Sequence, residues 1–202
     1  MIKKMTILYE IHGGLYVNLT NKCPCNCTFC LRQEGDGAHG SDSLWLEHEP
    51  SLEEVIEAFE EENLSKYKEV IFCGYGEPTT RLETLIEVCK YIRSKSDIKI
   101  RLNTNGLGDL IHGKPVAHLL KGYIDAISIS LNAPTAEEYL AVTRPKFGIE
   151  SFDAMLKFAS EAKDYVPKVT LSVVDTIGEE AIEKCRKIAE DIGVSYRVRE
   201  YV

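Results

Sequence analysis

The sequence predicts an α/β protein in which parallel strands form a partial, open (β/α)6 barrel of the TIM type. Six segments typical of strands alternate with longer segments of helical periodicity, as in a sheet built from βα units. Apolar and polar residues also alternate within strands: in 98–104, Ile100 and Leu102 alternate with Arg101 and Asn103. Strands covered by helices on both faces would instead be continuously apolar. A curved sheet accounts for the polar residues, because its polar face then lines a concave interior that a polar ligand fills.

The expected strands are separated by segments long enough to hold a helix each. The expected strands span residues 14–20, 69–74, 98–104, 124–131, 168–174 and 194–200. A closed eight-stranded barrel packs its interior with branched apolar side chains. The expected strands have polar side chains, and not branched apolar ones, on the face that would line this interior. The sequence therefore favours an open, ligand-filled barrel.

Capping boxes mark the expected helix starts, where Ser or Thr is followed three residues later by Glu. The three boxes are Ser51–Glu54, Thr80–Glu83 and Thr135–Glu138. Gly193 is expected to end the last helix. Cys89 and Cys185 lie on apolar helical faces and are expected to pack in the core.

Length and composition are those of one globular domain spanning 1–202, with 44% hydrophobic and 28% charged residues. The net charge of −8 gives no sign of a nucleic-acid-binding surface. No apolar run is long enough to cross a bilayer, and no apolar signal segment follows residues 1–4. We therefore expect a cytoplasmic protein in a reducing compartment.

Four cysteines lie within eight positions, and three of them, Cys23, Cys27 and Cys30, have C-x-x-x-C-x-x-C spacing. Soft thiolates converging from one short loop suit iron, and three of them supply three corners of a [4Fe–4S] cluster while leaving one iron open. No zinc-finger spacing completes a zinc site, and seven cysteines without a signal peptide argue against a disulfide framework. Cys25 is expected to be a loop residue that points away from the cluster.

The stretch Asn21 to Cys30, with Phe29 before the last cysteine, resembles the signature of the radical SAM superfamily. Cys73 to Thr79 resembles the glycine-glycine-glutamate motif of that superfamily. The longer stretches 44–47, 102–107 and 128–134 resemble the small TatD-associated radical SAM family. The resemblance implies a six-stranded partial barrel, a [4Fe–4S] cluster and S-adenosylmethionine (SAM), which is cleaved reductively to a 5′-deoxyadenosyl radical that abstracts hydrogen.

The resemblance also implies which residues surround SAM: Phe29, Gly74, Tyr75, Gly76, Glu77, Asn103 and Ser130. Phe29 would lie beside the adenine, and backbone groups of the glycine-containing stretch would bind the methionine amino group. Alternation independently places Asn103 and Ser130 on the polar face near strand ends. Glu77 is either a ligand-facing acceptor, which we favour, or an acidic residue at a helix start.

Arg101, Arg197 and Arg199 have the parity of the polar face, in a chain that is acidic overall. A buried guanidinium needs an anion, so we expect these arginines to bind a carboxylate or phosphate of the substrate. Ion pairs with Glu77 or Glu200, or simple exposure at the open edge, are equally compatible with the sequence.

The function that follows is a radical SAM enzyme acting on an unidentified, small anionic substrate, with a flavodoxin- or ferredoxin-type reductant. The alternatives are a non-catalytic iron–sulfur or zinc module and, within the superfamily, a protein-modifying enzyme. The connection 33–46 is long enough to be a lid. Its Trp45 would cap the pocket or anchor the loop, and His39 and His48 are expected to be solvent-exposed.

Overall fold

The computed structural model describes residues 5–33, 35–37 and 40–201, and its strands form one seven-stranded sheet. The strands are β1 (Leu8–Ile11), β2 (Gly14–Val17), β3 (Glu69–Phe72), β4 (Lys99–Thr104), β5 (Ala126–Ser130), β6 (Lys168–Val174) and β7 (Ser195–Arg199). They neighbour one another in sequence order, with β1 antiparallel to β2 and all later pairs parallel. The expected six parallel strands are therefore confirmed, as β2 to β7.

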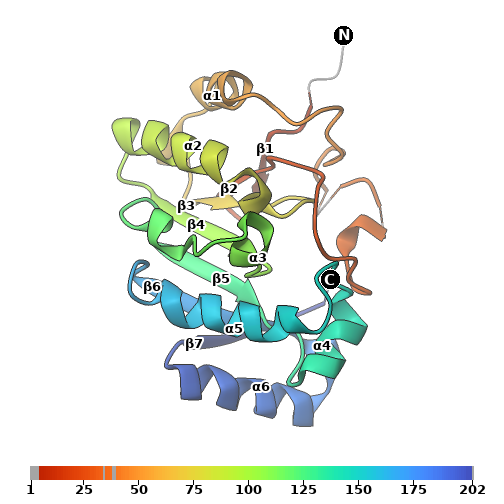
Figure 1. The fold of residues 1–202 in the computed structure, drawn as a ribbon. Coiled ribbons are helices and arrows are strands. Elements are labelled where there is room, and N and C mark those ends of the chain that lie inside the picture. Colours follow the sequence, from red (N-terminus) through yellow and green to blue (C-terminus); the bar gives the residue numbers. More distant parts are fainter. Residues whose placement is uncertain (1–4, 34, 38–39, 202) are drawn as a thin grey trace.

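The helices are α1 (Leu52–Glu60), α2 (Leu82–Lys95), α3 (Gly108–His112), α4 (Ala136–Thr143), α5 (Glu150–Ala162) and α6 (Glu179–Ile192). Short 3₁₀ segments are η1 (Leu31–Gln33), η2 (Leu64–Lys66), η3 (Pro78–Arg81), η4 (Ala117–Leu120) and η5 (Asp175–Ile177). Because the strand order never reverses, right-handed crossovers place the helices on the same side of the sheet, as Figure 1 shows. The other face is left for the interior of an open, partial barrel.

The sheet begins with a hairpin that the sequence analysis missed. β1 and β2 pair antiparallel, and the two-residue loop between them is formed by His12 and Gly13, which have φ of 50° and 79°. Positive φ at both loop residues is the type I′ geometry that matches the twist of paired strands. β1 is thus an extra antiparallel strand on the edge of the parallel sheet.

Two of the three expected helix starts are confirmed. Ser51 and Glu54 form a complete capping box at α1, and Thr135 caps α4 through the Glu138 amide. The Thr80–Glu83 box is wrong, because η3 precedes α2 and the Thr80 hydroxyl donates to the Glu77 carbonyl instead.

The other local expectations for the helices are also met. Gly193 ends α6 in the left-handed conformation, with φ of 77°. Cys89 and Cys185 are fully buried in the core, as expected. Among the described residues, no helix is long and apolar enough to cross a membrane.

The face of the sheet opposite the helices is polar in its central strands. Asn103 pairs with Ser128 and Ser128 with Thr170, and one row further Ser130 pairs with Ser172. Burial alternates along β4 and β5 as the sequence predicts. Toward β1 the expectation of a polar face fails, because Tyr9, Leu44 and Tyr75 form a separate buried apolar cluster there. The connection after β2 therefore covers one end of the concave face and leaves the rest polar.

Candidate active site

The cysteine-containing loop follows the carboxyl end of β2, the edge at which parallel barrels place their active sites. Within it the Cys25 thiol contacts the thiols of both Cys23 and Cys27 and is 8% exposed. The expectation that Cys25 points away from the other cysteines is wrong. Cys30 lies one turn further on, where its amide donates to the Cys27 carbonyl at 3.2 Å.

The thiols of this loop differ in their readiness to ionise. Hydrogen bonds with Cys25 lower the pKa of Cys23 and that of Cys27 below the usual value for a thiol. The same contacts raise the pKa of Cys25, and burial raises that of Cys30. Two of the three expected iron ligands are therefore biased toward the thiolate, which is the form that binds metal.

The end of α4 forms a platform for the cysteine loop. The amides of Asn26 and Thr28 donate to the carbonyls of Thr143 and Val142 at 3.0 and 2.9 Å. The Lys146 amide in turn donates to Pro24 at 2.8 Å. Sequence analysis missed this platform, because backbone contacts between loops far apart in the chain leave no local pattern. Figure 1 shows α4 beside the red and orange connection that follows β2.

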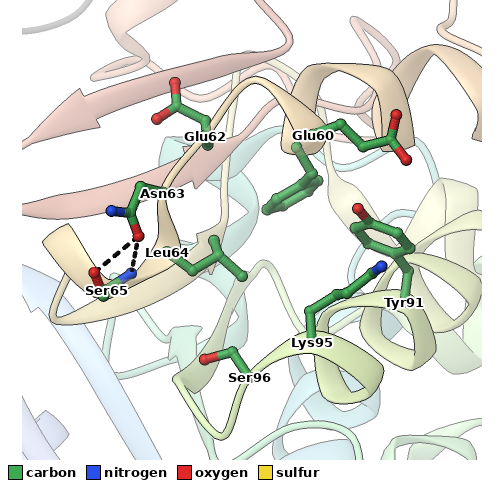
Figure 2. A pocket seen from close by; sticks show the side chains of 9 residues that line it. Glu60, Glu62, Asn63, Leu64, Ser65, Tyr91, Lys95 and Ser96 are labelled. Atoms are coloured by element: carbon green, nitrogen blue, oxygen red, sulfur yellow. Dashed lines mark hydrogen bonds between the residues drawn. The ribbon is translucent and has the colours of Figure 1, made fainter.

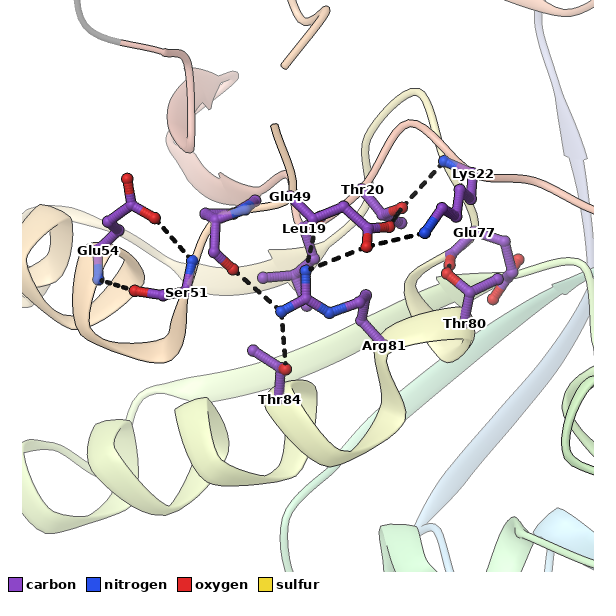
Figure 3. A network of polar contacts seen from close by, with 11 residues as sticks. Leu19, Thr20, Lys22, Glu49, Ser51, Glu54, Glu77, Thr80, Arg81 and Thr84 are labelled. Carbon is purple, nitrogen blue, oxygen red and sulfur yellow. Dashed lines mark hydrogen bonds and ion pairs between the residues drawn. The ribbon is translucent and has the colours of Figure 1, made fainter. Parts of the chain in front are cut away.

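A polar network holds the start of the cysteine loop (Figure 3). Glu49 accepts from the Thr20 hydroxyl at 2.6 Å and forms an ion pair with Lys22 at 3.0 Å. Arg81 donates to the carbonyl of Pro50 at 3.0 Å and to the Thr84 hydroxyl at 3.1 Å. The segment before α1 and the start of α2 are thereby joined to the residues that lead into Cys23.

The two glycines of the stretch after β3 are required by close packing on the strand that leads to the cysteines. A Cβ atom on Gly74 would lie 2.2 Å from Oδ1 of Asn18, and one on Gly76 would lie 2.2 Å from the Thr20 carbonyl oxygen. Both distances are far below van der Waals contact, so no side chain fits at either position. The glycines thus set the distance between the β2 and β3 connections, whatever ligand binds above them.

Tyr75 anchors the connection that follows the cysteines. Its hydroxyl donates to Gly35 at 2.7 Å and to Gly37 at 3.2 Å, and its ring packs edge-on against Trp45 at 5.0 Å. The guanidinium of Arg32 lies over the Trp45 ring at 5.1 Å. Of the two roles open to Trp45, the structure therefore favours anchoring the loop.

The two histidines expected to be exposed have different outcomes. His48 has an exposed side chain that lies 2.9 Å from Glu54. His39 lies outside the described residues.

The Glu77 carboxylate is buried and accepts hydrogen bonds from Thr79, Thr104 and Asn105. Oε1 accepts from the Thr79 amide at 3.0 Å and from the Thr79 and Thr104 hydroxyls at 2.7 Å, and Oε2 accepts from the Asn105 amide at 2.8 Å. Burial nevertheless raises the pKa of Glu77, because desolvation outweighs these hydrogen bonds. Glu77 thus caps η3 and joins the ends of β3 and β4.

The remaining expected SAM-binding residues lie around the concave face. Asn103 hydrogen-bonds the thiol of Cys73, whose pKa burial raises. Ser130 is half-buried beside Ser172 of β6, and Phe29 is half-buried within the cysteine loop. Cys73, which the sequence analysis did not assign to the site, is therefore part of the polar interior.

The three arginines do not converge on one point. Arg101 forms a two-pronged ion pair with Glu69, at 2.8 and 3.2 Å, and so already has an anion. Arg197 is exposed on the edge strand β7. Arg199 is half-buried near Cys27 and Cys73; its Nε has no partner among the described residues, and it donates only a long 3.4 Å bond to Asn132. Burial lowers the pKa of Arg199.

The donor set of the loop fits a [4Fe–4S] cluster. Thiols from one loop are in contact, and two are biased toward the thiolate. In the described part of the chain, no three histidine, cysteine or carboxylate side chains converge as a preformed site for a single metal ion. A cube-shaped cluster does not need such convergence, because each thiolate binds a separate iron.

A cleft of about 530 Å³ lies elsewhere, between α1, η2 and the end of α2 (Figure 2). Phe59, Tyr91 and Lys95 line it, with the Lys95 ammonium 5.6 Å from the Tyr91 ring. These elements precede β3 and β4, so the cleft is at the amino edge of the sheet, opposite the cysteine loop. It does not contribute to the candidate site.

Comparison with known proteins identifies a family. The model of the radical SAM superfamily matches residues 17–192. Molybdenum cofactor biosynthesis protein moc-5 from Caenorhabditis elegans is 28% identical over 164 residues, which are 81% of this chain and 25% of that protein. A GTP 3′,8-cyclase from Corynebacterium glutamicum is 33% identical over 143 residues, 67% of this chain and 35% of the cyclase. The chain thus spans only about a quarter and about a third of the length of these two relatives.

Solved structures share the fold. Streptococcus suis SuiB bound to S-adenosylmethionine superimposes with a TM-score of 0.64 at 17% identity, covering 94% of this chain and 41% of SuiB. The hydrogenase maturase HydG from Carboxydothermus hydrogenoformans gives 0.62 at 19% identity, covering 94% and 44%. At such identities the likeness concerns the fold alone.

Proposed function

The chain belongs to the radical SAM superfamily, and we propose that it acts on a small substrate whose carboxylate or phosphate binds beside Arg199. Membership makes the protein an enzyme that uses a [4Fe–4S] cluster and SAM. When bound, these two groups supply a 5′-deoxyadenosyl radical that abstracts hydrogen from the substrate. The protein supplies binding, orientation and exclusion of water.

We assign the cluster to Cys23, Cys27 and Cys30. Their loop is fixed on one side by the end of α4 and on the other by the Glu49–Arg81 network. For SAM we retain the set Phe29, Gly74, Tyr75, Gly76, Glu77, Asn103 and Ser130. The contacts described above give Tyr75 and Glu77 an indirect role, in which they position the backbone that binds the cofactor.

The Arg199 guanidinium, whose Nε has no partner among the described residues, carries the substrate assignment. Arg101 already has Glu69, whereas Arg199 has no carboxylate within 4.0 Å among the described residues and lies near Cys27. A half-buried guanidinium without an anion is costly, so a ligand anion is the simplest partner. Arg197, two residues earlier on the same strand, is exposed and adds positive charge beside Arg199.

The comparisons are compatible with an anionic substrate. The name of the cyclase relatives indicates GTP, an anionic nucleotide. We further propose a flavodoxin- or ferredoxin-type reductant and a reducing, cytoplasmic compartment, which the thiol-rich loop requires.

The first experiment tests the chemistry. Protein reconstituted anaerobically with iron and sulfide is reduced with dithionite in the presence of SAM, and 5′-deoxyadenosine is measured by chromatography. We expect product with the wild type and none with Cys30→Ala. A colourless wild-type protein that holds one zinc would identify a structural zinc module instead.

The second experiment tests the anion site. GTP and guanosine are titrated calorimetrically into the cluster-loaded, SAM-bound protein, with malonate as a carboxylate probe. We expect binding of GTP or malonate but not guanosine, weakened about tenfold or more by Arg199→Leu and retained by Arg199→Lys. Arg186→Leu, which removes an exposed guanidinium from α6, is the matched control. If Arg199→Leu leaves both anions bound as tightly as in the wild type, the anion assignment fails.

A further inference from the structure

The loop that carries the three expected iron ligands lies at the protein surface. Cys23, Cys27 and Cys30 are each half-buried, and the residues between them include the exposed Asn26 and Thr28. A cluster held by these cysteines is therefore close to this surface. A protein that delivers electrons to the cluster by the shortest route has to contact the same face.

Positive charge is concentrated in the two segments that form this face. Residues 21–33 contain the cysteines, and residues 142–149 contact them through backbone hydrogen bonds. We call the surface of these two segments the cysteine face. It has no acidic residue, although the chain has 32 acidic and 24 basic residues. Its basic residues are Lys22, Arg32, Arg144 and Lys146.

The charges of the cysteine face are largely available to a partner. Arg144 and Lys146 are exposed, and neither has a carboxylate within 4.0 Å among the described residues. The Lys146 ammonium lies 4.8 Å from the centre of the Phe147 ring, which does not neutralise it. Lys22 pairs with Glu49 at 3.0 Å but keeps 74% of its side chain exposed.

Exposed apolar side chains accompany these charges. Leu31 and Trp45 are each 38% exposed and Ile149 is 50% exposed, and only two other large hydrophobic side chains in the described ranges are exposed. Leu31 and Ile149 belong to the cysteine face, and the Trp45 ring lies 5.1 Å from the Arg32 guanidinium. Apolar and aromatic side chains next to arginine are typical of protein–protein interfaces.

We propose that the cysteine face is the docking surface for an acidic one-electron carrier protein of the flavodoxin or ferredoxin type. The inference rests on the proposed function, with its cluster at Cys23, Cys27 and Cys30. In the step that docking serves, the carrier is oxidised by one electron and the bound cluster is reduced by one. No covalent bond is made or broken, and the oxidised carrier then dissociates.

The charge of the chain favours an acidic carrier at this place. A net charge of −8 repels an acidic protein from most of the surface, so one positive face orients the partner as well as attracting it. Electron-transfer complexes are also small, burying less than about 1,200 Å² in total. A few exposed cations next to apolar side chains are therefore sufficient for such a short-lived contact.

The experiment compares two reductants on the cluster-loaded protein. Formation of 5′-deoxyadenosine from SAM is driven either by a purified flavodoxin, reduced enzymatically, or by dithionite at saturating concentration. In the wild type we expect the flavodoxin-driven rate to fall severalfold between about 0.05 and about 0.5 M NaCl, because salt screens the contact, and the dithionite-driven rate to change little. Calorimetric titration with oxidised flavodoxin gives the dissociation constant independently of activity.

The double variant Arg144→Glu/Lys146→Glu reverses two exposed charges outside the cysteine loop. We expect kcat/KM for flavodoxin to fall about tenfold or more and the dissociation constant to rise by a similar factor. Iron content and the dithionite-driven rate should equal those of the wild type. Lys184→Glu/Lys187→Glu makes the same change in charge at exposed positions of α6 and is the matched control, which should behave as the wild type.

Equal flavodoxin kinetics and affinity in the wild type and in Arg144→Glu/Lys146→Glu would overturn the proposal. If that variant assembles less cluster, the wild type alone decides, because a flavodoxin-driven rate no more sensitive to salt than the dithionite-driven rate excludes docking through charge. Weaker binding of GTP with unchanged flavodoxin kinetics would assign these cations to the substrate and would also overturn it.

Failure of the proposed function looks different. A cluster-loaded wild type would then form no 5′-deoxyadenosine with dithionite, while calorimetry with flavodoxin would still show whether the cysteine face binds an acidic carrier. A wild type that assembles no cluster gives a carrier nothing to reduce, and this result disproves the docking proposal together with the proposed function.

Discussion

The Glu77 carboxylate accepts a 2.7 Å hydrogen bond from the hydroxyl of Thr104, which ties the connection after β3 to the end of β4. The same carboxylate holds the Thr79 and Asn105 amides. One buried acid therefore fixes the spacing between two strand ends that face the cysteine loop. Its hydrogen bonds are internal, so its first effect is on the structure around the cofactor.

Glu77→Ala is expected to destabilise the protein by about 3 kcal/mol or more, because buried donors of Thr79, Thr104 and Asn105 lose their acceptor. Urea unfolding of the cluster-loaded protein under anaerobic conditions measures this. Glu83→Gln, which changes an exposed acid in the first turn of α2, is the control and should be close to neutral. Equal stability of Glu77→Ala and the wild type would show that these hydrogen bonds do not hold the two strands.

The pH dependence of stability should carry the signature of Glu77. Its pKa is raised by burial above the usual 4.5, so folding favours proton uptake at this group. Its contribution to stability is therefore greatest below pH 4.5 and is lost as the pH rises through the folded-state pKa. Relative to Glu77→Gln, the free energy of unfolding of the wild type in urea is expected to fall as the pH is raised through the folded-state pKa of Glu77. A difference that grows with pH would mean that the hydrogen bonds outweigh desolvation.

Close packing at Gly76 leads to a prediction about cluster loading. Because a Cβ atom there would lie 2.2 Å from the Thr20 carbonyl oxygen and 2.7 Å from that of Lys22, Gly76→Ala must push away the segment that leads to Cys23. We expect a loss of about 1–3 kcal/mol in stability and a lower iron content after reconstitution. Gly35→Ala is the matched control, since a Cβ atom there meets nothing within 4 Å. Full iron content in Gly76→Ala would show that the loop adapts.

Much of this fold follows from local pattern. Alternation along 98–104 places Arg101 and Asn103 on one face, and the strands lie within a few residues of their expected bounds. Sequence order, helix periodicity and the caps at Ser51 and Thr135 are similarly local. Such features are readable because each depends on residues close together in the chain.

Partners across the sheet are not readable in the same way. Parity gives the face on which Arg101 lies, but its partner Glu69 depends on the register between β3 and β4, which no local pattern specifies. The contact between Asn26 and Thr143 likewise joins segments more than a hundred residues apart. Cys25 was misjudged for the same reason, because its direction is set by the end of α4.

The residue that ends α4 offers a test of how strain next to the cysteine loop is tolerated. Arg144 has φ of 45° and occupies the left-handed C-cap position, which disfavours any residue with a Cβ atom. Arg144→Gly is expected to raise stability to urea by about 1 kcal/mol, whereas Arg144→Ala keeps the strain and should not. The exposed side chain makes loss of other contacts a small correction. If both substitutions destabilise equally, the guanidinium, and not the backbone conformation, is what the platform beneath Pro24 and Asn26 depends on.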